Sequence, residues 1–349
     1  MRIKSIIILT LLAAVIFAFG LWKFKKDSQG MRESAPIERN LTVFTYPSFM
    51  SDYGPGPKLK EEFEKNCHCK VRYLNAGDSV IMLQKLKIKS KLAADVVIGL
   101  DQFTQNMAAS ELEWLPLEMA SDVKWREELR GIAKDVFIPY DWAPITFIYR
   151  KGELPELQSL EDLKNAKYIS QLSLQDPRSS TPGLQFLYWL YAVYGSEGMF
   201  TYLKEIQPSI QSISPSWSAS YGLFKQKQAG LTLSYLTSPL YHWREDGDRS
   251  YQAAAIKEGH PVQVEFMAVP KRCKECDLAK EFVRYLLEPP SQKIIADHNF
   301  MLPVIENVES DPLWKDLPDL EILPANRWEE FLTMQDQLLQ NWVQVSRGQ

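Results

Sequence analysis

Residues 94–100 read ADVVIGL, an almost continuous run of apolar side chains with the length of one β-strand. A strand without polar alternation is typical of a parallel sheet that is covered on both faces. Two more strand patterns precede it, at 41–46 (LTVFTY) and 69–75 (CKVRYLN), and helical patterns at 58–66 and 79–90 follow them. This alternation predicts a doubly wound α/β sheet.

Ligands of such sheets bind beyond the carboxyl ends of the strands. The three ends in question are Tyr46-Pro47-Ser48, Gly77-Asp78-Ser79 and Gly99-Leu100-Asp101. Each end offers a hydroxyl or a carboxylate. The first half of the chain therefore predicts a polar site at this edge of the sheet.

The following segment, 136–149 (VFIPYDWAPITFIY), indicates two strands joined across Pro139–Pro144 and a crossover into a second lobe. The expected elements after it are a helix at 160–166, strands at 169–174 and 231–235, helices after Pro182 and near 200–206, a return strand at 262–269, a helix at 279–287, a loop at 299–303 and a helix at 328–345. The predicted division is 41–142 for the first lobe, 143–262 for the second, 263–304 for the return, and 305–349 for a C-terminal helical segment packed on the lobes. The fold class is thus a two-lobed α/β fold with a cleft between the lobes.

The 349 residues are 45% hydrophobic and 24% charged, which is an ordinary globular composition. The formal net charge is −4 and no basic stripe is present. Nucleic-acid binding is not expected, because the phosphate backbone would require a concentration of positive charge.

The N-terminus has the pattern of an export signal. Arg2 and Lys4 precede an apolar core at 6–17, and Ala18-Phe19-Gly20 offers a small-x-small cleavage site. We expect residues 1–20 to be a signal peptide, 21–40 a tether and the mature protein to be periplasmic. An uncleaved membrane anchor is the alternative, since 6–22 is just long enough to span a bilayer.

Four cysteines occur as two local pairs, Cys67 with Cys69 and Cys273 with Cys276. Disulfides suit an exported protein, although these residues and His68 are also zinc-ligand types. Three disulfide connectivities are possible, and the spacing does not decide among them.

The stretch Gln175–Gly183 (QDPRSSTPG) combines a turn, three hydroxyl residues and a helix start. Ser179, Ser180 or Thr181 can cap the helix, with Pro182 at its first position. The free N–H groups of a helix start also bind phosphate, carboxylate or alcohol groups. The motif predicts either an ordinary capped helix or the anchor of a ligand.

Aromatic residues gather beside polar ones at three other places. Trp217 and Tyr221 are four apart and share one face of a helix. Residues 234–243 (SYLTSPLYHW) and Tyr140-Asp141-Trp142 follow the same pattern. Core packing is the simpler explanation of each ring, but together they suit a flat cationic heterocycle.

In these segments the chain resembles the periplasmic thiamine-binding proteins of bacterial ABC importers. The resemblance covers LTVFTYPSF, DYGPGPKLKEEFEKNCHC, ADVVIGLD, FIPYDWAPITFIY, QDPRSSTPGL, SWSASYGLF, LSYLTSPLYH and NFMLPV, in the order of the family and over about residues 41–305. It implies a type II periplasmic-binding fold, thiamine or its phosphate esters as cargo, an ABC permease as partner, no cofactor, no catalysis and a monomer.

The resemblance also implies a set of ligand-binding residues. An aromatic cage would consist of Tyr46, Trp142, Trp217, Tyr221, Tyr235 and Tyr241, with Ser238 beside it and Phe300 in the last loop. Asp78 and Asp101 would face the cationic rings. Ser179, Ser180 and Thr181 would bind the hydroxyethyl or phosphate end.

The chain departs from the family at several of these positions. The family's Trp-Met-Tyr-Pro loop is Phe300-Met301-Leu302-Pro303 here, which makes one wall smaller and removes a tyrosine. Trp142-Ala143 and Asp78-Ser79 replace an aromatic-Gly and an Asp-Gly pair. A related pyrimidine, a thiamine phosphate or another cationic aromatic ligand therefore stays open.

Three other functions compete with thiamine capture. Secreted thiamine-degrading enzymes share the fold but use a cleft cysteine as nucleophile, which the paired cysteines do not suit. Ferric-ion receptors use two adjacent tyrosines, whereas Leu236 follows Tyr235 here. A receptor for a polyamine or another cation would also use aromatic rings and carboxylates.

Overall fold

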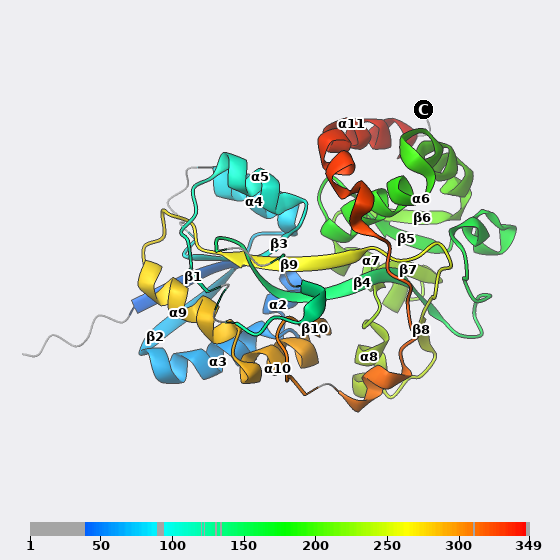
Figure 1. Cartoon of the computed structure of the whole chain (residues 1–349). Helices are drawn as coiled ribbons and strands as arrows, with labels where there is room; N and C mark the ends of the chain where they lie inside the picture. Colours follow the sequence, from blue (N-terminus) through cyan, green and yellow to red (C-terminus); the bar gives the residue numbers. More distant parts are fainter. Residues whose placement is uncertain are drawn as a thin grey trace, which may run out of the picture. The chain divides into compact units, whose positions relative to one another are not determined.

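A computed structural model describes residues 39–88, 94–119, 121, 123–129, 131–132, 135–309 and 311–346. Asn40–Gln349 form one compact unit, and the expected signal peptide and nearly all of the expected tether lie outside the described residues. The fold of this unit is a mixed parallel and antiparallel sheet covered by helices (Figure 1). The predicted two-lobed α/β class is confirmed, whereas the lobe boundaries stay a prediction.

The first lobe is built around β3 (Val96–Asp101), all of whose residues are buried. Its strands follow the order β2-β1-β3-β9, and β9 runs antiparallel to β3. Helices α4 and α5 cover one face, and α3, α9 and α10 cover the other (Figure 1). The remaining elements are β1 (Arg39–Thr45), α2 (Pro47–Met50), α3 (Gly56–Cys67), β2 (Cys69–Asn75), α4 (Ser79–Lys87), α5 (Thr104–Glu111), η1 (Glu127–Leu129), β9 (Val262–Ala268), α9 (Cys276–Leu286), α10 (Pro289–His298) and β10 (Leu302–Pro303).

The second lobe has its own buried core, which includes Phe147, Trp189, Leu233 and Phe331. Strands β7, β5 and β6 are parallel neighbours where they pair, and α6 and α11 lie together over them (Figure 1). Its elements are η2 (Leu160–Lys164), η3 (Ala166–Tyr168), β5 (Leu172–Gln175), α6 (Thr181–Ile206), η4 (Gln207–Ser209), β6 (Ile210–Ser214), α7 (Trp217–Lys225), β7 (Leu231–Tyr235), α8 (Pro239–Tyr241), η5 (His242–Asp246), β8 (Tyr251–Ala253), η6 (Pro312–Asp316), η7 (Ala325–Arg327) and α11 (Trp328–Ser346).

One long strand, β4 (Ile138–Arg150), connects the two lobes. Its first half pairs with β9 and its second half with β7 and β8. The expectation of two strands joined across Pro139–Pro144 is therefore wrong. Pro139 lies at a register shift between β4 and β9, where the regular ladder is interrupted, so the strand continues despite its missing N–H.

Two expected helices also differ. Residues 160–166 form short 3₁₀ turns, because Ser159 and Asn165 each cap a new turn with their side chains. The helix expected near 200–206 is the end of the long helix α6, which bends at Gly195 with a positive φ of 73°. Gly195 adopts this conformation without the steric cost of a Cβ atom.

The cysteines form two local disulfides, Cys67–Cys69 and Cys273–Cys276, which resolves the connectivity that the sequence left open. Both belong to the first lobe and pack against its core. Within the described residues, we find no helix that is long and apolar enough to cross a membrane.

Candidate functional site

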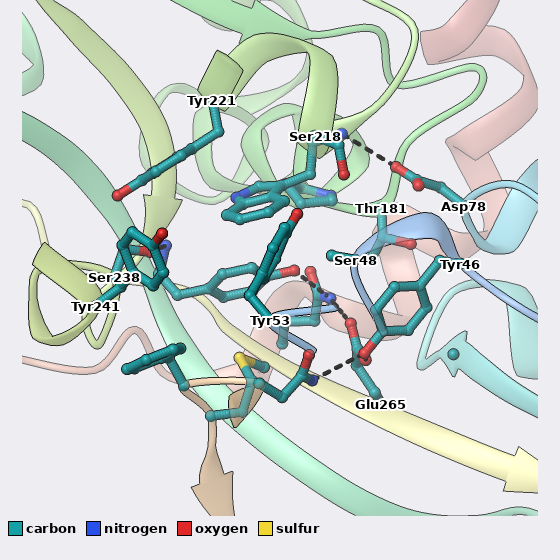
Figure 2. A pocket seen from close by; sticks show the side chains of 18 of the residues that line it. Tyr46, Ser48, Tyr53, Asp78, Thr181, Ser218, Tyr221, Ser238, Tyr241 and Glu265 are labelled. Atoms are coloured by element: carbon teal, nitrogen blue, oxygen red, sulfur yellow. Dashed lines mark hydrogen bonds between the residues drawn. The ribbon is translucent and has the colours of Figure 1, made fainter. Parts of the chain in front are cut away.

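A cavity of about 210 Å³ lies where the two lobes meet. Figure 2 shows how side chains from both lobes converge on it. The lining residues come from the strand ends of the first lobe, the helix starts of the second lobe, β9 and the loop before β10: Tyr46, Ser48, Tyr53, Asp78, Ser79, Gly99, Thr181, Pro182, Trp217, Ser218, Tyr221, Gly222, Lys225, Tyr235, Ser238, Tyr241, Gln263, Glu265, His298, Asn299, Phe300 and Met301.

Two glycines bring these elements close together. A Cβ atom on Gly99 would lie 2.4 Å from the Tyr46 ring, and the φ of Gly99 is +105°. A Cβ atom on Gly183 would lie 2.5 Å from the Gln175 carbonyl oxygen, so glycine lets the start of α6 approach the end of β5. Both positions therefore need glycine for steric reasons.

The first wall of the cavity is aromatic. Trp217 and Tyr221, one turn apart on α7, stack with a centroid distance of 4.8 Å and an interplanar angle of 22°. The indole N–H of Trp217 donates to Ser234 Oγ at 2.8 Å, and the Tyr221 hydroxyl pairs with His242 Nε2 at 3.1 Å. These bonds fix both rings, so the wall is preformed.

A second aromatic part of the lining is formed by Tyr241, Phe300 and Tyr53. The Tyr241 ring meets Phe300 edge to face at 5.6 Å and Tyr53 at 6.3 Å. The ammonium group of Lys225 lies 4.7 Å from the centroid of Tyr241. This part of the cavity thus combines aromatic surface with one positive charge.

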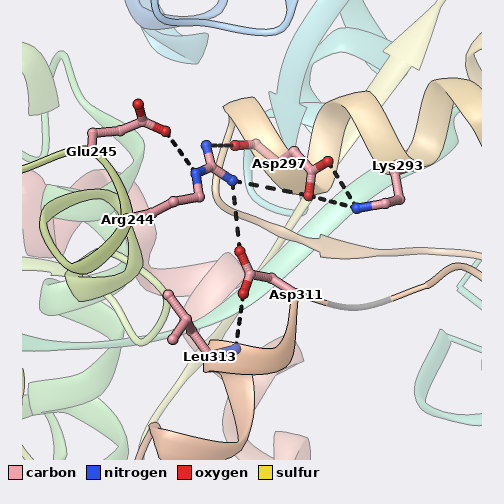
Figure 3. Close-up of polar contacts among 6 residues, drawn as sticks. All are labelled: Arg244, Glu245, Lys293, Asp297, Asp311 and Leu313. Atoms are coloured by element: carbon pink, nitrogen blue, oxygen red, sulfur yellow. Dashed lines mark hydrogen bonds and ion pairs between the residues drawn. The ribbon is translucent and has the colours of Figure 1, made fainter. Parts of the chain in front are cut away.

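Arg244 supports Phe300 from outside the cavity. Its guanidinium carbon lies 4.6 Å from the Phe300 centroid, and the group also contacts Asp297, Asp311 and Glu245 (Figure 3). Phe300 has a positive φ of 54°, a conformation that a bulky residue rarely adopts without support. Arg244 is therefore a positioning residue of this wall.

Asp78 lies at the junction of the lobes and is the N-cap of α4. Its carboxylate accepts from Ser180 Oγ at 2.7 Å and from the Trp217 N–H at 3.3 Å. Burial raises its pKa to about 6, although these two hydrogen bonds oppose the shift. Deprotonated Asp78 is a counter-charge for a cation in the cavity.

Glu265 is the second acidic group of the cavity. Tyr46 donates to its Oε2 at 2.8 Å, Tyr140 donates to the same oxygen, and Gln263 donates to Oε1 at 2.8 Å. Asn299 Nδ2 in turn donates to the Tyr46 hydroxyl at 2.9 Å. Figure 2 shows Glu265 and Tyr46 side by side at the cavity wall.

Nine of the thirteen residues predicted from the sequence line the cavity: Tyr46, Asp78, Thr181, Trp217, Tyr221, Tyr235, Ser238, Tyr241 and Phe300. The other four are not part of the lining. The Ser180 hydroxyl donates to the Asp78 carboxylate, and the Ser179 hydroxyl donates to the Pro215 carbonyl at 2.8 Å.

Asp101 and Trp142 belong to the protein interior. Asp101 accepts from the N–H groups of Phe103 and Thr104 at 2.8 and 2.7 Å, so its carboxylate orders the turn before α5. Trp142 packs in the core of the first lobe and donates to the Pro303 carbonyl.

The sequence reasoning missed Glu265, Gln263, Lys225 and Asn299. One signal was present: in the strand VQVEFMAV, Gln263 and Glu265 alternate with apolar residues and share one face. Polar groups that alternate within an otherwise buried strand indicate a face turned toward a site. Nothing in the local sequence singles out Lys225.

A zinc site does not compete for these residues. In the part of the chain that the structure describes, no group of three or more His, Cys, Asp or Glu side chains is placed to hold a metal ion. The cysteines that could have served as ligands are joined in disulfides.

A preformed, aromatic and acidic cavity between two lobes joined by crossing strands is the arrangement of an extracytoplasmic solute receptor. The sequence profile of the bacterial extracellular solute-binding proteins matches residues 58–322, and the chain belongs to this family. Within it, the resemblance to thiamine-binding periplasmic proteins is confirmed. Proteins of that name from Brucella melitensis and Escherichia coli are 37% identical over 277 residues (78% of this chain and 82% of theirs) and 36% identical over 291 residues (82% and 88%).

The solved structures agree with this placement. A periplasmic thiamin binding protein superimposes with a TM-score of 0.81 at 32% identity, covering 90% of this chain and 98% of the other. A ferric binding protein from Campylobacter jejuni reaches a TM-score of 0.68 at 16% identity, which shows the shared fold alone.

Proposed function

We propose that this chain is a periplasmic receptor that binds thiamine reversibly in the cavity and delivers it to an ABC permease. The observation that supports it best is the combination of stacked Trp217 and Tyr221 with two carboxylates of the cavity lining, half-buried Asp78 and buried Glu265. Aromatic faces and carboxylates together favour a flat cation. The names of the relatives point to the same ligand.

The polar lining also suits the aminopyrimidine ring. Gln263 lines the cavity, and its Oε1 has no hydrogen-bond partner among the described residues. A buried acceptor without a partner is costly, and an amino group of the ligand would satisfy it. The Thr181 hydroxyl, at the start of α6, is hydrogen-bonded to Ser79 Oγ at 2.5 Å. Because Ser79 donates its own proton to Asp101, Thr181 Oγ1 is left as an acceptor for a hydroxyl group of the ligand.

Binding without chemical change is the mechanism that these residues favour. All four cysteines are in disulfides, so the thiol nucleophile of thiamine-degrading enzymes is missing. Closure of two lobes around the ligand would bury it and present a new surface to the permease. We expect the receptor to act as a monomer, which light scattering tests.

The experiment is an incubation of the mature protein with thiamine, followed by native mass spectrometry and release of the ligand. The proposal predicts one thiamine per chain, recovered with unchanged mass. Cleaved pyrimidine or thiazole products would show an enzyme instead, and a protein that retained no thiamine would exclude the receptor role.

A further inference from the structure

Three acidic residues stand at one level of the central sheet. Asp101 on β3 and Asp141 on β4 are both register partners of Glu265 on β9, the strand between them. The Asp101 carboxylate accepts hydrogen bonds from the backbone N–H groups of the turn before α5 and, at 2.9 Å, from the Ser79 hydroxyl. Glu265 and Asp141 are left as a pair of adjacent carboxyl groups.

This pair is deeply buried. Glu265 is 7% exposed and Asp141 is fully buried. Among the described residues, neither forms an ion pair with a lysine, an arginine or a histidine within 4.0 Å. Two adjacent carboxyl groups in a dry interior do not both ionise, because each negative charge disfavours the other.

The two members differ in their hydrogen-bond donors. Glu265 accepts from Tyr46, Tyr140 and Gln263. Asp141 accepts from Asn299 at 2.6 Å, and its Oδ1 has no partner in the described part of the chain. Asp141 is thus the better proton holder, and burial and the charge of Glu265 raise its pKa well above the usual range.

Glu265 is the member that reaches the cavity. Burial raises its pKa to about 7, against the effect of its three donors. The other titratable or charged groups that line the same cavity are Tyr46 next to β1, Tyr53 between α2 and α3, Asp78 before α4, Tyr221 and Lys225 of α7, Tyr235 of β7, Tyr241 of α8 and His298 of α10. A lysine is therefore present in the lining, but it lies over Tyr241.

We infer that Glu265, backed by a protonated Asp141, is the residue that selects a cationic ligand, and that the entering cation displaces the proton that Glu265 holds in the empty protein. This inference rests on the proposed function. It adds that the site selects its ligand by positive charge. A fixed cation stabilises the carboxylate next to it, so cation binding and proton release are linked. A neutral ligand of the same shape has no such effect.

The test is a calorimetric titration with thiamine at pH 6 and pH 9, each in two buffers of different ionisation enthalpy. The wild type is expected to release roughly one proton per thiamine at pH 6 and almost none at pH 9, because Glu265 is already ionised there. Glu265→Gln should lose most of the release at pH 6 and bind thiamine roughly tenfold more weakly at pH 9. Asp78 is about half protonated at pH 6, so it can add up to about half a proton, and this part should remain in Glu265→Gln.

Two controls make the result specific. Glu281→Gln changes an exposed glutamate on α9 and should behave as the wild type. The thiophene analogue of thiamine, with carbon in place of the charged ring nitrogen, should bind wild type and Glu265→Gln equally and release no proton. If Glu265→Gln does not fold, Asp141→Asn tests the pair instead. Its neutral amide stands in for the protonated carboxyl, so proton release at pH 6 should stay as in the wild type, and a lost release would overturn the protonated state of Asp141.

The failures of the two proposals are distinguishable. Thiamine binding with the same proton release in wild type and variant would overturn the role of Glu265 and leave the receptor function intact. A wild type that does not bind thiamine would overturn the receptor function, and the selection of a thiamine cation with it.

Discussion

The Ser180 hydroxyl donates to the Asp78 carboxylate at 2.7 Å, which joins the start of α6 in the second lobe to the start of α4 in the first. Trp217 adds its N–H to the same oxygen, Asp78 Oδ2. One carboxylate therefore holds the two lobes together beside the cavity. The same group is a counter-charge for the ligand. Asp78 therefore contacts both lobes and also contributes negative charge to the cavity.

The raised pKa of Asp78 predicts a dependence of stability on pH. The pKa is raised from 3.8 to about 6 by burial, so the carboxylate is the form that folding disfavours. Its contribution to stability is present below pH 4 and is lost as the pH rises through about 6. Asp78→Asn should therefore stabilise the empty protein by about 1 to 3 kcal/mol at pH 8 and by almost nothing at pH 4.

Urea unfolding of wild type and Asp78→Asn at pH 4 and pH 8 measures this difference. Thiamine binding should weaken in the same variant, because the cation loses a counter-charge. A variant that is less stable than the wild type at pH 8 would show that the hydrogen bonds of Asp78 outweigh its desolvation.

Trp217 should be the main reporter of ligand binding. Its ring stacks on Tyr221 and lines the cavity, so a bound ring system would quench its fluorescence. Trp217→Ala is expected to weaken thiamine binding by about 1 to 3 kcal/mol, and Trp217→Phe to remove most of the quenching. Trp314→Phe, outside the lining, is the control and should keep both the affinity for thiamine and the fluorescence quenching. Full quenching in Trp217→Phe would place the ligand elsewhere.

Arg244 should affect affinity through Phe300. Arg244→Ala removes the cation–π support of this ring and is expected to weaken thiamine binding roughly tenfold, or about 1.4 kcal/mol. Arg249→Ala is a matched control, since Arg249 also lies 4.6 Å from a ring, that of Trp243, and pairs with Asp316. Equal effects of both variants on affinity would mean that general stability, rather than the position of Phe300, is what changes.

Lys225 should distinguish thiamine from its phosphate esters. It is a lysine in the cavity lining, and a phosphate group would gain from its charge. Lys225→Ala is expected to weaken the binding of thiamine monophosphate by roughly tenfold and to leave the binding of thiamine nearly unchanged. Lys227→Ala, two residues further and paired with Glu153, controls for net charge. An equal loss for both ligands in Lys225→Ala would contradict this assignment.

Local pattern was sufficient for much of this fold. The strands at 41–46, 94–100 and 231–235 were predictable because their apolar runs have strand length and are bounded by turn residues. The shared face of Trp217 and Tyr221 followed from their spacing of four residues. Helical and strand periods are properties of the chain itself, so these features needed no tertiary information.

The missed features depend on tertiary contacts. The continuous strand β4 passes Pro139 at a register shift against β9, and that shift depends on the partner strand rather than on the local sequence. Asp101 stands at a strand end like Asp78, but a threonine three residues later gives it hydrogen bonds within its own turn. Glu265 joins the site only because β9 lies between β3 and β4.

The most direct test of the account is a calorimetric titration of the mature protein with thiamine, repeated with putrescine. The account predicts saturable one-to-one binding of thiamine and much weaker binding of putrescine, because the stacked rings at Trp217 and Tyr221 require a flat partner. Putrescine binding as tight as or tighter than thiamine would contradict it and point to a general receptor for organic cations.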